Sequence, residues 1–259
     1  MKKNLYYRTM FRRHNAIKEF FLTFFYAICS IPRLLLEVFI RKNLGERYFS
    51  FSTAMVTAFI LLCIPLTIGA IPSLYNRYSG AQFDILTFLI KYLTWYLCLA
   101  GFVAKCFDRR HELKRLPSVF DFARFSLSAG TIHPSFYQFR FKGRSFNIRE
   151  IETMLEPGFF FVIGFVLMLI AQPVGFLIML CAICYSISYV ATYHNGDNFI
   201  MDKIDEMILN EEYVNSFVDG RDPEDTRGVR YYGRTPADPE VRRQMVDSII
   251  VDTDFVEAR

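Results

Sequence analysis

The chain has 259 residues, of which 53% are hydrophobic and 22% are charged, and its formal net charge is +4. This composition lies between those of soluble and of fully membrane-embedded proteins, so about half of the chain is expected in or on a bilayer. Four of the six cysteines lie inside apolar runs and the four histidines stand singly, which argues against a disulfide framework and against a metal site.

The charges are distributed unevenly along the chain. Residues 1–48 carry ten Lys and Arg against three acids, and residues 105–157 carry ten against six. Residues 191–259 reverse the balance, with eight Lys and Arg against sixteen acids. Basic segments beside membrane helices are attracted to anionic lipid. The two basic segments are therefore expected at the membrane surface, and the acidic tail is expected to be free for protein partners.

Four long apolar runs dominate the sequence, at Phe51–Ile71, Ile85–Val103, Phe159–Ala171 and Val174–Val190. A bilayer core about 30 Å thick requires about 20 apolar residues of α-helix. The first two runs reach that length alone, and the last two suit a tight helical hairpin. The sequence therefore predicts an all-α polytopic membrane protein with four transmembrane helices, an N-terminal interfacial helical region, a small cytoplasmic α+β insert and a partly disordered C-terminal tail.

Residues 1–48 form a basic segment in which cations are mixed with aromatic residues. The cations of its first part are Lys2, Lys3, Arg8, Arg12 and Arg13. Aromatic rings favour the bilayer interface and cations bind anionic headgroups. Nucleic acid attracts the same residue types, but the adjoining apolar segment favours lipid. We therefore expect these five residues to contact headgroups and expect no nucleic acid to bind.

Residues 16–40 are apolar but are interrupted by charged residues and by Pro32. Their longest uninterrupted stretch is about twelve residues, which is short for a crossing helix. Two helices that are broken at Pro32 and lie in the membrane interface are therefore predicted. The alternative is one tilted helix that adds a fifth crossing.

Residues 49–106 are expected to form the first transmembrane hairpin. Basic residues flank it on both sides, in Arg41–Arg47 before it and in the sequence FDRRHELKR after it. Because Lys and Arg accumulate in cytoplasmic loops, both chain termini are expected in the cytoplasm, and the membrane is expected to be a bacterial inner membrane. The bases after the hairpin that are expected to contact headgroups are Arg109, Arg110, Lys114 and Arg115.

Two strongly polar residues fall within the predicted crossings, Lys91 and Gln172. An ionisable residue inside a membrane helix is a functional-site hypothesis by default. Three interpretations of Lys91 stay open. Its side chain snorkels toward the helix end or forms a structural pair, it takes part in transport or gating, or it contacts another subunit.

Residues 107–157 form the soluble insert. Alternating apolar and polar residues around Gly143 predict a β-hairpin over residues 137–148, and Asn147 is expected to cap a short helix over residues 148–155. The insert is rich in Phe and Tyr but is too small to bury them alone. It is therefore expected to lean on the membrane surface, on the tail or on a neighbouring subunit.

Residues 158–193 are expected to form the second transmembrane hairpin, with its turn at Ala171–Gly175. One continuous helix over these residues would be about 54 Å long, well beyond the thickness of a bilayer. Gly158, Gly164 and Gly175 permit close contact between the two helices.

Residues 194–259 form the acidic tail. Asp197–Phe217 has apolar residues at three- and four-residue steps and carboxylates on the other face, which predicts an amphipathic helix. Because anionic lipid repels the carboxylates, the apolar stripe is expected to bind protein. A linker over Asp219–Pro239 then leads to a terminal docking segment. The residues expected to bind partners are Ile200, Ile204, Met207, Ile208, Ile249 and Ile250.

The sequence contains no recognised catalytic motif: it lacks a phosphate-binding glycine loop, H-E-x-x-H and G-x-S-x-G. We therefore expect no enzyme activity, no catalytic residue, no cofactor and no metal. The aromatic insert, the amphipathic helix and the terminal segment all lack intramolecular partners, which predicts a scaffold or anchor subunit of a homo- or hetero-oligomer such as a secretion or conjugation machine. The alternative is an oligomeric channel or transporter that uses Lys91 and Gln172, and a membrane-bound enzyme comes third.

Overall fold

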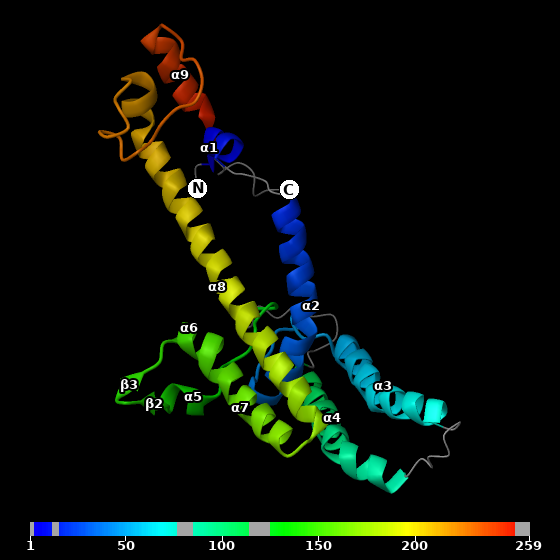
Figure 1. Cartoon of the computed structure of the whole chain (residues 1–259). Coiled ribbons are helices and arrows are strands. Elements are labelled where there is room, and N and C mark those ends of the chain that lie inside the picture. The colour runs from blue at the N-terminus through cyan, green and yellow to red at the C-terminus, as the bar shows by residue number, and fades with distance from the viewer. Residues whose placement is uncertain (1–2, 12–15, 77–84, 114–124, 252–259) are drawn as a thin grey trace. The chain divides into compact units, whose positions relative to one another are not determined.

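The computed structural model describes residues 3–11, 16–76, 85–113 and 125–251 (Figure 1). Most of these residues are helical. The chain divides into two units, which are described separately. Leu22–Thr192 forms the first, here named the helical unit, and Met1–Phe21 together with Tyr193–Arg259 forms the second, the terminal unit.

Five helices in the described part of the chain are long and apolar enough to cross a membrane, which is consistent with an integral membrane protein. Each of the four predicted apolar runs falls on one of them. The fifth comes from the segment in which the sequence indicates interfacial helices. The five candidate spans are Phe20–Ile40, Phe51–Ile68, Phe88–Leu113, Ile148–Leu169 and Pro173–Val218.

Helix α2 (Ala16–Ile40) contains the first candidate span and runs through Pro32 without interruption. The predicted break at Pro32 is therefore wrong. Proline removes one backbone donor, but a helix tolerates this loss where its neighbours hold it in place. The turns after Pro32 are held in this way, because Leu35, Leu36 and Val38 are buried.

The core of the helical unit lies where α2, α4 (Ile85–Leu113) and α8 (Pro173–Tyr213) meet. Leu36, Phe102 and Tyr185 are among its fully buried side chains. Helix α3 (Phe51–Asn76) packs along α4. The indole nitrogen Nε1 of Trp95 in α4 donates to the carbonyl of Leu61 in α3 at 2.9 Å, which ties the two helices together.

A continuous helical run leads into the second hairpin. It consists of α6 (Ile148–Glu150), the π-helical segment η2 (Ile151–Leu155) and α7 (Glu156–Leu169). Its turn to α8 falls within the predicted segment Ala171–Gly175.

Two glycines allow α7 and α8 to approach closely. A Cβ atom on Gly175 would lie 2.5 Å from the carbonyl oxygen of Gly164, and one on Gly164 would lie 2.8 Å from that of Gly175. A Cβ atom on Gly158 would meet nothing within 4 Å. Two of the three predicted contact glycines therefore lie at the close approach.

The insert contains the predicted β-hairpin. Strands β2 (Arg140–Phe141) and β3 (Arg144–Ser145) pair antiparallel, with Arg140 opposite Ser145. The turn residues Lys142 and Gly143 both have positive φ, 50° and 81°, as a two-residue type I′ turn requires. Helix α5 (Pro134–Gln138) precedes β2. Asn147 caps α6, and its backbone N–H donates to Glu150 Oε2 at 3.0 Å.

The terminal unit brings the two ends of the described chain together. Strand β1 (Lys3–Asn4) pairs antiparallel with β4 (Ile250–Val251), so that Asn4 lies opposite Ile250. Helix α1 (Leu5–Met10), the second part of α8, the π-helical segment η3 (Val214–Val218) and α9 (Pro239–Ile249) complete the unit. Its buried core consists of Leu209, Tyr213, Phe217, Val218 and Val246.

Candidate functional site: a buried ionic network beside a polar cavity

The interior of the helical unit contains a group of charged side chains. Glu37, Arg41 and Glu156 are each 0% exposed. Charged residues are almost never buried to this degree unless they are paired. Glu37 lies in the last turn of α2, Arg41 directly follows that helix, and Glu156 opens α7. Residues from distant parts of the sequence therefore form one buried site.

Arg41 uses all three of its guanidinium nitrogens within the site. Nη2 donates to Glu156 Oε2 at 2.5 Å and to Glu152 Oε1 at 3.0 Å. Nε donates to Glu156 Oε2 at 3.2 Å. Nη1 donates to the hydroxyl of Tyr189 and to the carbonyl of Ala129. The planar guanidinium thus links the end of α2 to η2, α7 and α8.

The two carboxylates that contact Arg41 stand at the two ends of a π-helical turn. Glu152 lies within η2 and Glu156 directly follows it. Oε1 of Glu152 and Oε2 of Glu156 both contact Nη2 of Arg41. The π-helical turn therefore places two carboxylates against one guanidinium. Single π-helical turns inside helices occur often at functional sites.

Glu156 is held from one side only. Oε2 accepts from Arg41 and also from the hydroxyl of Tyr185, at 2.6 Å. Oε1 is buried and has no hydrogen-bond partner among the described residues. A buried acceptor without a partner carries a desolvation cost. This oxygen therefore lowers the stability of the network.

Glu37 is the second centre of the network, and both of its oxygens accept hydrogen bonds. Oε1 accepts from Arg33 Nε and from the hydroxyl of Tyr189, both at 2.8 Å. Oε2 accepts from the hydroxyl of Tyr48 at 2.6 Å. Burial, and then the charge of Glu37, raise the pKa of Tyr48 above its ordinary value, so its hydroxyl keeps the proton that it donates.

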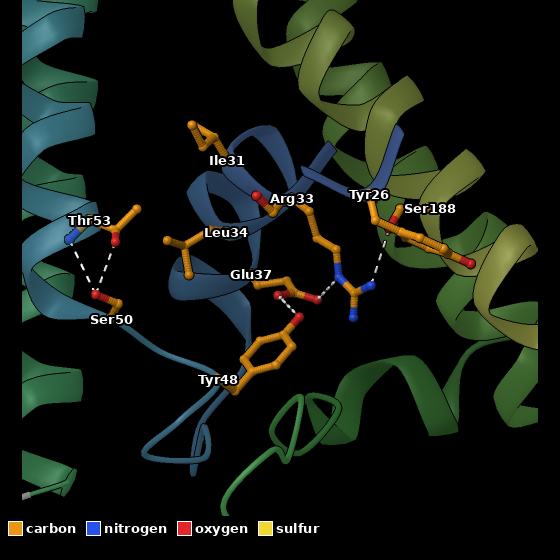
Figure 2. A pocket seen from close by; sticks show the side chains of 10 residues that line it. Tyr26, Ile31, Arg33, Leu34, Glu37, Tyr48, Ser50, Thr53 and Ser188 are labelled. Atoms are coloured by element: carbon orange, nitrogen blue, oxygen red, sulfur yellow. Dashed lines mark hydrogen bonds and ion pairs between the residues drawn. The ribbon is translucent and has the colours of Figure 1, made fainter. Parts of the chain in front are cut away.

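A cavity of about 320 Å³ adjoins this second centre (Figure 2). Figure 2 shows the Arg33–Glu37 pair facing Tyr48, with Thr53 on the neighbouring helix α3 and Ser50 directly before that helix. The guanidinium of Arg33 also donates to Ser188 Oγ at 3.2 Å and stacks 3.8 Å from the ring centroid of Tyr189. Six lining residues carry hydroxyls: Tyr26, Ser30, Tyr48, Ser50, Thr53 and Ser188. The cavity is therefore suited to water or to a small polar group.

Lys91 and Gln172 lie apart from this network. The side chain of Lys91 is exposed on α4, and its ammonium lies 5.6 Å from the ring centroid of Tyr92. Gln172 lies in the turn between α7 and α8, where Oε1 accepts from Thr94 Oγ1 at 2.7 Å. The hydrogen bond therefore ties that turn to α4.

Arg109 does not occupy the position expected of a headgroup contact. Its side chain is only 4% exposed, its Nε donates to the carbonyl of Val38 at 3.3 Å, and its Nη1 pairs with Glu112 at 2.5 Å. The expectation was wrong because the last turns of α4 pack against α2, which turns this side chain toward protein. Phe39 and Phe102 meet at the same packing surface.

The other expected headgroup contacts divide into two groups. Arg110 and Arg8 are exposed, and the guanidinium of Arg110 lies 4.3 Å from the ring centroid of Phe51. The remaining six lie outside the described residues or, for Lys3, have an undescribed side chain: Lys2, Lys3, Arg12, Arg13, Lys114 and Arg115.

The expected partner-binding residues also divide. Ile200, Ile204 and Met207 are 55%, 50% and 55% exposed on α8, and Ile208 is half-buried. Ile249 and Ile250 instead pack against the core of the terminal unit. These two residues therefore contribute to the fold of the terminal unit.

Within the described ranges, His, Cys, Asp and Glu do not gather in groups of three that could hold a metal ion. Comparison with known proteins finds no family model, no curated protein and no solved structure that matches this chain. The site must therefore be interpreted from its own chemistry.

Proposed function

We propose that this chain is a non-catalytic integral membrane subunit that seats partner proteins of a larger assembly through its terminal unit. One observation carries the proposal. The part of α8 that belongs to the terminal unit has an exposed apolar stripe, and the acidic residues around it are unfavourable in lipid.

Residues 193–218 contain six acids and one base. Each charged residue costs about 2.5–3.5 kcal/mol at the centre of a bilayer, and acids are repelled by an anionic surface. This part of α8 is therefore a water-facing helix. Ile200, Ile204 and Met207 follow one another at helical spacing on it and are at least half exposed, and such a stripe on a water-facing helix is typical of a protein interface.

The opposite face of the same helix is already occupied. Leu209 and Tyr213 lie in the core of the terminal unit, and Glu206 accepts from the backbone N–H of Asn4 at 2.9 Å. The stripe residues are therefore not part of the core of the terminal unit. The partner that fits the stripe has an apolar strip of its own that can cover Ile200, Ile204 and Met207.

The pairing of β1 with β4 supports the expected topology of four crossings. From the pairing of the two ends of the described chain we infer that both lie on one side of the membrane and that the chain between them crosses an even number of times. Of the five candidate spans, at least one therefore does not cross. Helix α2 is the natural choice, because it carries Arg33 and Glu37. The flanking bases favour the cytoplasm of an inner membrane as the shared side.

The stripe is tested with Ile204→Asp combined with Met207→Asp, and with Met201→Asp as the matched control. Met201 is exposed on the same helix but lies about 100° around the axis from Ile200. Native mass spectrometry after extraction in mild detergent should show the double variant as a lone subunit and the control in the intact assembly. An unchanged assembly of the double variant, with helix content preserved, would contradict the proposal. Point variants are preferable to removal of the tail, which would delete Val246 from the core.

The second candidate is an oligomeric channel or transporter, and the ionic network is the observation that favours it. Glu156 has an unpartnered buried oxygen, and the linked Arg33–Glu37 pair borders a polar cavity. Proton or ion flux in proteoliposomes should then fall in Glu156→Gln and persist in Glu150→Gln, which changes an exposed pair. Absence of flux from the unaltered protein would remove this class.

A further inference from the structure

The β2–β3 hairpin is covered by large side chains that no other part of the described chain buries. Tyr137, Phe139 and Phe141 are 50%, 49% and 58% exposed, and Ile148 just beyond the hairpin is 56% exposed. Single exposed apolar residues are ordinary, but a contiguous group of this size marks a surface that binds something.

The hairpin is built so that it cannot bury these side chains itself. Each strand has two residues, and successive side chains of a strand point to opposite faces. The rings of Phe139 and Phe146 stack at 6.0 Å, which is the main ring contact within the hairpin. The rings of Tyr137 and Phe141 stay at least half exposed.

The charge of this region is of one sign. Residues 125–149 contain four bases and no acid. Arg144 is paired with Glu150 at 2.5 Å. Arg140 and Lys142 are exposed at the hairpin itself, and their charges are complementary to an anionic surface.

The hairpin also adjoins a candidate membrane span. The ring of Phe136 packs edge-on against Phe159, with centroids 6.0 Å apart. Phe159 lies in the first turns of α7, within the candidate span Ile148–Leu169. In Figure 1 the two strands lie next to α5 and α6, where the chain enters that span. Aromatic side chains at this level are typical of the membrane–water interface.

We propose that the β2–β3 hairpin inserts Phe139 and Phe141 into the interface of the chain's own bilayer, where Arg140 and Lys142 bind anionic phospholipid headgroups. A bilayer fits both the exposed aromatic side chains and the basic residues of the hairpin. It adjoins α7, and its interface offers apolar and anionic groups at the same depth. This anchor sets the height of the insert against the membrane. It holds whether or not the terminal unit seats a partner.

The test uses the full chain with Phe141→Trp, in lipid nanodiscs. The native Trp95 is buried, so its emission is subtracted with the unaltered protein. Lipids brominated near the headgroup should quench the added Trp, and the quenching should be about twofold stronger when phosphatidylglycerol is mixed into phosphatidylcholine. Adding Arg140→Glu and Lys142→Glu should remove that difference. Arg234→Glu with Arg243→Glu, an equal charge change at two exposed residues of the terminal unit, should not.

Two results would overturn the proposal. A Trp at position 141 that is quenched by aqueous iodide but not by brominated lipid faces water. A Trp that is shielded from both quenchers is covered by protein. Circular dichroism and the Trp95 emission confirm for each variant that the helical unit is folded, so that neither result can come from a misfolded chain.

Discussion

Arg41 and Glu156, which are 115 positions apart in the chain, form an ion pair from which solvent is fully excluded. The pair joins the end of α2 to the start of α7 inside the helical unit. Breaking such a pair is costly, because the charge that remains is left buried without its partner. The stability of the helical unit therefore depends on charged residues that flank its apolar segments.

The first prediction concerns this pair. Glu156→Leu should lower the free energy of unfolding by about 3–5 kcal/mol, because Glu152 is then the one ion-pair partner that Arg41 keeps among the described residues. The control Glu150→Gln, at an exposed pair, should change it by less than about 1 kcal/mol. Denaturant titration in detergent measures both.

The same argument predicts a rescue. In Arg41→Met combined with Glu156→Leu neither charge is left buried, so more than half of the loss should be recovered. A double variant as unstable as the single one would show that packing around the pair, rather than its charge, determines stability.

The second prediction concerns the close approach of α7 and α8. Gly175→Val should destabilise the hairpin by at least about 1–3 kcal/mol, because the new side chain meets backbone atoms that cannot yield. Gly158→Ala is the matched control and should be neutral or stabilising by up to about 1 kcal/mol, since its Cβ has open space. Equal thermal melts for the two variants would contradict the glycine contact.

The third prediction concerns Asn4, which is fully buried. Its side chain accepts from the backbone N–H of Tyr7 and donates to Asn210 Oδ1 at 2.6 Å. Asn4→Ala should cost about 1–3 kcal/mol and should speed amide exchange in β1, β4 and α9. Thr9→Ala removes an exposed hydroxyl bond and should leave exchange unchanged. Slow exchange in both variants would show that α1 is held by other contacts.

The fourth prediction is a pH dependence of the terminal unit. Burial, and then the charge of Asp202, raise the pKa of Tyr7 to about 12. Because the unfolded chain titrates near about 10, the folded unit holds this proton more tightly. The associated stability is complete below pH of about 10 and is lost as pH rises through about 12. Tyr7→Phe lacks this group, so thermal melts should show a smaller alkaline loss than in the unaltered protein. Parallel losses would contradict it.

Local patterns in the sequence were sufficient for several elements. The apolar runs, the turn at Ala171–Gly175 and the hairpin at Gly143 all follow from residues that are neighbours in the chain. The break at Pro32 was wrong because packing of the following turns, which no local pattern contains, holds α2 together.

The buried network was missed, although parts of its signal are local. Arg33 and Glu37 stand four residues apart, as do Tyr185 and Tyr189 within an apolar run, and each pair shares a helix face. Nothing in the sequence indicates that these two faces meet. In the same way, the charge of Arg109 predicts a contact with lipid headgroups. Its side chain lies on the side of α4 that faces α2, so it contacts protein instead.

The sequence alone determined the four long apolar runs that suit a bilayer, because length and apolar content are properties of contiguous residues. Only the tertiary structure decided what the charged residues beside these helices do. Arg41 is neutralised by acids more than a hundred positions away. An ion pair in the interior is stable only when distant helices bring its members into contact and keep water out.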